Sequence, residues 1–106
     1  MQLDFQQTPE HVQSVSNALG AIDYELSNEH LIIMPGALKQ GTNRLEIDFI
    51  AGENSLNRNP EYLYTLFVPD RARTAFPLFD QPDLKAHYQL SLRVPADWEA
   101  ISNAPL

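Results

Sequence analysis

The sequence predicts a mainly β protein, an antiparallel β-sandwich or saddle-shaped sheet, with residues 1–106 forming a single domain. Hydrophobic residues make up 43% of the chain, which is enough for a small core. Residues 45–49 and 86–94 alternate apolar and polar side chains, a pattern typical of strands with one wet face. Because strand-like sequence begins near Met1 and the chain stops shortly after another such run, we expect a partial domain excised from a longer chain.

The first twenty residues are expected to form two extended segments. Residues 2–5 predict a short strand, which the turn signal around Pro9 follows. Residues 12–17 predict a second strand. The alternative is a helix over residues 9–19 with Thr8 as its cap, but that stretch has too few apolar positions for a helix face.

Residues 21–49 carry the next elements. The β-rich runs 21–26 and 31–34 predict a hairpin around the polar pair Ser27-Asn28. A single helical or 3₁₀ turn is expected over residues 35–40, with Gly41 ending it. The alternation over residues 45–49 then predicts a half-buried strand.

The second half of the chain is expected to contain three more β segments. Residues 62–68 and 86–94 predict strands, and residues 98–101 begin a last one after a turn at 95–97. The polar residues 51–60, which include three asparagines, predict the longest loop.

The connection between the strands at 62–68 and 86–94 is predicted to be a stiff corner. Proline fixes φ and restricts the residue before it, and this connection holds Pro69, Pro77 and Pro82. Arg73 and Asp80 flank the mostly apolar segment 74–79. An ion pair between them would hold the turn in one conformation. We therefore interpret Arg73, Asp80, Pro77 and Pro82 as structural turn residues.

Composition argues against several functions. The formal net charge of −7 disfavours nucleic acid, because that binding depends on Lys and Arg at phosphates. The absence of an 18-residue apolar run gives no reason to expect a membrane partner, and the absence of cysteine excludes disulfides and thiolate sites. The choice between a cytoplasmic and a periplasmic or secreted location stays open.

Catalytic and metal-binding patterns are missing from the sequence. His11, His30 and His87 lack the i, i+4 spacing that places two zinc ligands on one helix face. Ser55 and Ser102 lack a neighbouring base and are interpreted as turn residues. We therefore expect no catalytic residue, no metal ligand and no cofactor in this segment.

A set of spaced residues around the corner resembles a known family signature. The set comprises Thr65, Ala72-Arg73, Phe76-Pro77, Asp80-Gln81-Pro82 and Lys85-Ala86. It is similar to the pattern of the amino-terminal β domain in the aminopeptidase N family of zinc metallopeptidases. The similarity continues through residues 88–94, and a weaker similarity reaches back to about Val12.

The resemblance implies a non-catalytic domain of a zinc peptidase. Such a domain would wall the active-site cleft and help to position the amino end of a peptide substrate, while a later catalytic domain of the same chain binds zinc. Leu66 and Val68 occupy positions where the family carries Gln and Glu or Gln, the latter of which helps to hold the substrate amine. Neither side chain here accepts a hydrogen bond, so the resemblance implies that this contribution is lost.

The alternative is a free-standing β-sandwich that binds a protein or a glycan. The antiparallel pattern, the acidic charge and Trp98 are compatible with it. In either case, strands at a sheet edge expose unpaired backbone groups, so we expect the isolated fragment to form edge-strand dimers.

Overall fold

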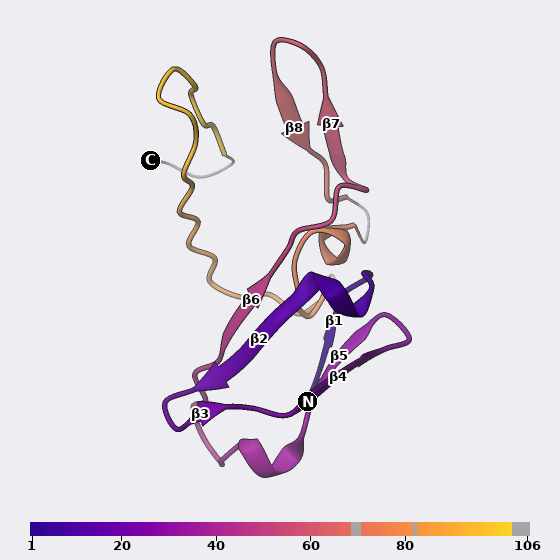
Figure 1. The fold of residues 1–106 in the computed structure, drawn as a ribbon, viewed down its shortest axis with the longest axis vertical. Coiled ribbons are helices and arrows are strands. Elements are labelled where there is room, and N and C mark those ends of the chain that lie inside the picture. The colour runs from indigo at the N-terminus through magenta and orange to yellow at the C-terminus, as the bar shows by residue number, and fades with distance from the viewer. Residues whose placement is uncertain (69–70, 82, 103–106) are drawn as a thin grey trace.

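The computed structural model describes residues 1–68, 71–81 and 83–102. The protein is mainly β with antiparallel sheets, as the sequence predicted (Figure 1). Within the described ranges, the helical elements are three short 3₁₀ turns, none of which has the length or hydropathy of a membrane-spanning helix. Pro69 and Pro82 of the predicted corner lie outside the described residues.

The first sheet has three strands in the order β1-β5-β4: β1 (Gln2–Asp4), β5 (His30–Ile33) and β4 (Tyr24–Ser27). The predicted hairpin is formed by β4 and β5, but its turn lies one residue later than predicted. Asn28 and Glu29 both have positive φ, 49° and 63°, as the two-residue turns of tight hairpins require. Ser27 therefore pairs with His30 as part of the ladder.

The second sheet has the order β3-β2-β6: β3 (Gly20–Ala21), β2 (Val12–Asn17) and β6 (Glu46–Phe49). The strands predicted at 12–17 and 45–49 are thus confirmed. The alternative helix is reduced to the 3₁₀ turn η1 (Pro9–His11). A second such turn, η2 (Pro35–Ala37), confirms the single turn expected after β5, although it ends well before Gly41.

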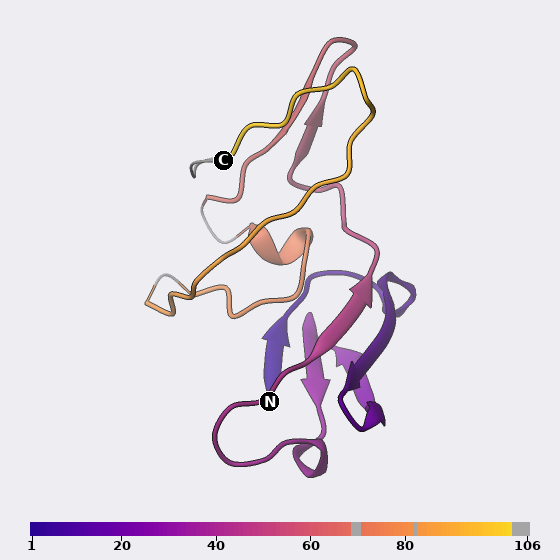
Figure 2. The same ribbon diagram turned by 90° about the vertical axis from the view of Figure 1, so that its left-hand side faces the viewer.

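One hydrophobic core unites the two three-stranded sheets. Its central side chain is Phe5, which is fully buried just after β1 and packs edge-on against Phe49 with ring centroids 5.9 Å apart. The buried cluster draws on both sheets and the segments next to them: Leu3, Phe5, Val12, Val15, Ile22, Leu31 and Ile33. The core therefore lies in the half of the molecule that contains the N-terminus (Figures 1 and 2).

The third sheet is a hairpin of β7 (Leu56–Arg58) and β8 (Leu63–Thr65) that projects from the other end of the molecule (Figures 1 and 2). The prediction of a loop over residues 51–60 was therefore wrong at β7. The asparagine-rich composition hid a strand that pairing with β8 stabilises. Asn59 closes the hairpin, because its Oδ1 accepts hydrogen bonds from the backbone N–H groups of Glu61 and Tyr62.

The strands predicted at 86–94 and 98–101 are not formed. In the described structure, residues 86–94 make no backbone hydrogen bonds to a neighbouring strand, and Tyr88, Leu90, Leu92 and Val94 are exposed. Alternating apolar and polar residues give a segment two distinct faces. A β-strand also needs hydrogen bonds to a neighbouring strand. The turn expected at 95–97 is present, with the N–H of Trp98 donating to the carbonyl of Pro95.

Candidate functional site

The corner after β8 folds back onto the first strand. It contains the 3₁₀ turn η3 (Ala72–Thr74) and the chain that follows it to residue 81. Asp4 and Leu78 exchange backbone hydrogen bonds, and the N–H of Gln6 donates to the carbonyl of Arg73 at 2.8 Å. The corner is therefore joined through its backbone to the edge of the first sheet.

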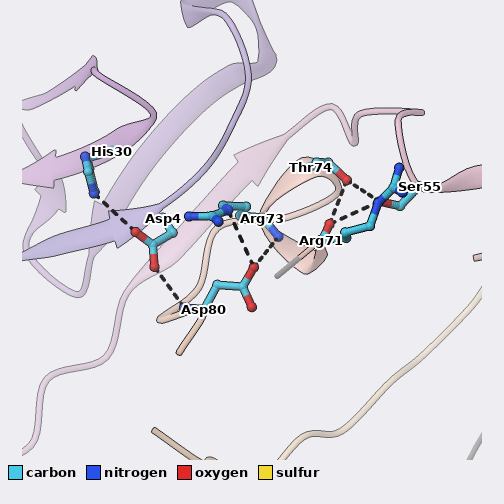
Figure 3. A network of polar contacts seen from close by, with 7 residues as sticks. All are labelled: Asp4, His30, Ser55, Arg71, Arg73, Thr74 and Asp80. Atoms are coloured by element: carbon cyan, nitrogen blue, oxygen red, sulfur yellow. Dashed lines mark hydrogen bonds and ion pairs between the residues drawn. The ribbon is translucent and has the colours of Figure 1, made fainter. Parts of the chain in front are cut away.

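A charged cluster lies on the β1 side of η3 (Figure 3). Asp80 Oδ2 accepts a hydrogen bond from the backbone N–H of Arg73 at 3.1 Å, and Arg73 Nε lies 3.9 Å from the same oxygen. Asp4 Oδ2 accepts from the N–H of Asp80, while Asp4 Oδ1 lies 3.2 Å from His30 Nε2. These carboxylates are occupied by contacts within the fold. Pro77 lies half-buried within the same corner.

A hydroxyl cluster lies on the opposite side of η3 (Figure 3). The buried side chains of Ser55 and Thr74 approach to 2.7 Å between their hydroxyl oxygens. Arg71 Nε donates to Ser55 Oγ at 3.3 Å, and Arg71 Nη2 donates to the carbonyl of Asn54 at 2.7 Å. The chain before β7 is thus tied to the corner.

The same region contains a close backbone approach at Gly52. Gln7 Nε2 donates to the carbonyl of Thr74 at 2.7 Å and to Asn54 Oδ1 at 3.0 Å. A Cβ on Gly52 would lie 1.8 Å from Gln7 Nε2 and 2.0 Å from the Thr74 carbonyl oxygen. Only glycine fits between these atoms.

Leu66 and Val68, for which the resemblance implies positions near the substrate, follow β8 at the entrance to the corner. Leu66 is 56% exposed and Val68 is 74% exposed. The N–H of Leu66 donates to the carbonyl of Ser55 at 3.1 Å, and the N–H of Arg71 donates to the carbonyl of Phe67 at 3.0 Å. The exit segment, residues 66–68, is therefore held by its backbone while two of its side chains face outwards.

The histidines do not fit a zinc site. Nδ1 of His11 contacts the carbonyl oxygen of Ile50 at 2.8 Å, His30 contacts Asp4, and His87 lies on the exposed segment after the corner. Among the residues that the structure describes, no three His, Cys, Asp or Glu side chains gather as a metal site would require.

Sequence reasoning missed several residues of these clusters. Ser55 was interpreted as an ordinary turn residue, and Asp4, Gln7, Gly52 and Thr74 were not singled out. Their partners are distant in sequence: Ser55 lies 19 residues from Thr74, and Gln7 lies 67 residues from it. The polar composition of residues 51–55 was the available signal, but it did not identify the partners.

The architecture and the corner define a small antiparallel β domain. Residues 2–106 match the family described as the Peptidase M1 N-terminal domain. The chain therefore belongs to the amino-terminal domain family of the M1 aminopeptidases, as the resemblance implied.

Individual relatives agree with this assignment. The chain is 36% identical over 94 residues to "Probable aminopeptidase 1" of Sulfurisphaera tokodaii, an alignment that covers 80% of this chain and 12% of the relative. It is 37% identical over 76 residues to "Aminopeptidase M1" of Arabidopsis thaliana, covering 67% and 9%. "Aminopeptidase N" of Streptomyces lividans is 56% identical over 45 residues, covering 42% and 5%.

The chain thus spans about an eighth or less of the length of each of these relatives. No solved structure gives a significant match.

Proposed function

We propose that this domain walls one side of the active-site cleft of a zinc aminopeptidase and helps to position the amino end of a peptide substrate. Zinc and the reacting groups would belong to a catalytic domain of the same polypeptide. The contribution of the present residues would be to hold substrate and exclude water, which favours reaction without bond chemistry.

The exposed exit segment after β8 is the observation that carries this proposal. Leu66 and Val68 direct apolar side chains outwards from a backbone that Ser55 and Arg71 hold in place. By the resemblance, Leu66 stands where the family usually carries Gln, and Val68 stands where it carries the Glu or Gln that helps to hold the substrate amine. With Leu66 and Val68 at these positions, the domain would still line the cleft, but its side chains there would accept no hydrogen bond from the substrate amine.

The free-standing binding module is the weaker proposal. Trp98 is 46% exposed, so its ring could contact a ligand. Among the described residues, however, no binding site surrounds it. The family match over residues 2–106 favours the peptidase domain instead.

The experiment compares Val68→Glu with Leu19→Glu in the full peptidase that contains this domain, using aminoacyl chromogenic substrates. A carboxylate at residue 68 would accept from the substrate ammonium and lower KM by about threefold or more. Leu19 is 97% exposed on the turn between β2 and β3, so Leu19→Glu adds the same charge far from the exit segment. Equal KM values for the two variants and the wild type would contradict the proposed wall.

A further inference from the structure

We propose that Ser55 and Thr74 are positioning residues, whose paired hydroxyl groups fix the exit segment and thereby the cleft wall that Leu66 and Val68 form. The inference rests on the proposed function for its consequence in substrate binding. Its structural part, the hold on residues 66–68 and on Arg71, stands on the contacts of this chain alone.

Two arrangements of protons satisfy both hydroxyl groups, and each ends in a hydrogen bond to the carbonyl of Arg71 (Figure 3). In one arrangement, Thr74 Oγ1 donates to the carbonyl of Arg71 at 2.7 Å, which leaves its lone pairs free to accept. Ser55 Oγ can then donate to Thr74 Oγ1 at 2.7 Å and accept from Arg71 Nε at 3.3 Å. In the other arrangement, Ser55 Oγ donates to the carbonyl of Arg71 at 3.2 Å and Thr74 Oγ1 donates to Ser55 Oγ. In either case the hydroxyl pair is bonded to Arg71.

The hydroxyl pair reaches the exit segment at both of its ends. The carbonyl of Ser55 accepts from the N–H of Leu66 at 3.1 Å, at the start of the segment. Beyond its end, Arg71 contacts the side chain of Ser55 and donates its N–H to the carbonyl of Phe67. Displacing Ser55 would therefore move both supports of Leu66 and Val68.

The pair is also anchored to the body of the domain. The carbonyl of Thr74 accepts from Gln7 Nε2, and Gln7 follows β1 and the core residue Phe5. Ser55 and Thr74 are only 3% and 6% exposed, so bulk water has little access to replace a lost hydrogen bond. The hydroxyl pair thus connects the exposed exit segment to the buried core beside β1.

Ser55 has no catalytic role in this arrangement. Its side-chain partners are Thr74 and Arg71, and no histidine or carboxylate contacts its oxygen in the described structure. A base of that kind is what a serine nucleophile requires.

The test compares Thr74→Val with Thr74→Ser in the full peptidase. Valine keeps the shape but removes the hydroxyl group, whereas serine keeps the hydroxyl group. Thr74→Val should raise KM for aminoacyl substrates by about threefold or more at nearly unchanged kcat, and Thr74→Ser should restore the wild-type KM. Ser14→Ala is the control, because Ser14 donates to Asp48 on the exposed β2–β6 pair, away from the corner.

Amide hydrogen exchange of Leu66, Phe67, Val68 and Arg71 separates this inference from the proposed function. Thr74→Val should accelerate exchange there by about tenfold, whether or not the segment faces a cleft. Unchanged exchange would overturn the inference. Unchanged KM, in an enzyme where Val68→Glu does alter KM, would also overturn it. If Val68→Glu leaves KM unchanged, the proposed cleft wall is refuted. Hydrogen exchange alone then tests whether the hydroxyl pair fixes the exit segment. Ser55→Ala provides the same readouts should Thr74→Val fail to fold.

Discussion

The backbone N–H of Asp80 donates to Oδ2 of Asp4 at 2.9 Å, across 76 residues of sequence. Asp4 belongs to β1 at the edge of the first sheet, and its other carboxylate oxygen contacts His30 of the neighbouring strand. Asp80 in turn accepts from the N–H of Arg73. One half-buried carboxylate therefore couples the sandwich-like body to the corner.

Replacing Asp4 by alanine should destabilise the chain. The N–H of Asp80 would lose its acceptor in a poorly hydrated position, which costs about 1–3 kcal/mol of unfolding free energy. Urea unfolding followed by circular dichroism measures this loss. Asp48→Ala is the matched control, because Asp48 is exposed and accepts from Ser14, and it should change stability by less than about 0.5 kcal/mol. Equal midpoints for the two variants would contradict the coupling.

Gly52→Ala should be strongly destabilising, whereas Gly36→Ala should be nearly neutral. The new Cβ at residue 52 would overlap the Thr74 carbonyl and the Gln7 amide, and relief requires a backbone shift that costs about 1–3 kcal/mol. No atom lies within 4 Å of the corresponding position at Gly36. Thermal unfolding of the two variants provides the comparison. A Gly52→Ala midpoint equal to that of Gly36→Ala would show that the loop does not pack as described.

The fold class could be predicted from local patterns, but the pairing of strands could not. Residues 45–49 and 86–94 alternate equally well, yet only the first segment forms a strand, because β2 lies beside it. Conversely, β7 has an unfavourable composition and forms because β8 and the turn at Asn59 provide its ladder. Tertiary context decided both cases.

The candidate site divides in the same way. Arg73 and Asp80 stand out in the sequence because they are opposite charges on either side of a short, proline-containing apolar segment. Ser55 and Thr74 are not, since neutral hydroxyl groups 19 residues apart carry no pairing signal. Gly52 likewise reveals its role only when the Thr74 carbonyl is placed against it. Local chemistry could indicate where a corner lies, but not which distant side chains hold it.

Glu10 offers a test by pH. A hydrogen bond from the Thr8 side chain, reinforced by a backbone hydrogen bond, lowers the pKa of the exposed Glu10 carboxyl below its usual value. The ionised Glu10 carboxylate therefore stabilises the folded state at pH values above its unfolded-state pKa. This contribution to folding stability is lost as pH falls through the lowered pKa of the folded state. Thr8→Val should raise the pKa of Glu10, as measured by NMR titration. Thr42→Val is the control: Thr42 is exposed in the segment between η2 and β6, and its replacement should leave that pKa unchanged. An unaltered Glu10 pKa in Thr8→Val would exclude the hydroxyl as the cause.

The isolated chain should associate through its open β edges. In the described structure β8 pairs only with β7, and the apolar face of residues 88–94 has no strand beside it. Such surfaces favour edge-to-edge pairing. The net charge of −7 opposes association of two copies, so added salt should promote it by screening.

Light scattering coupled to size exclusion measures this association over a range of protein concentrations. We expect the average mass to rise from that of a monomer towards that of a dimer, and Leu90→Lys to shift the rise to higher concentration by about tenfold. Leu19→Lys alters charge equally at a residue on the turn between β2 and β3, and should not reproduce the shift beyond its general effect on repulsion. A monomer mass at all concentrations and salt levels would refute the prediction, because the exposed edges would then have no affinity for a second copy.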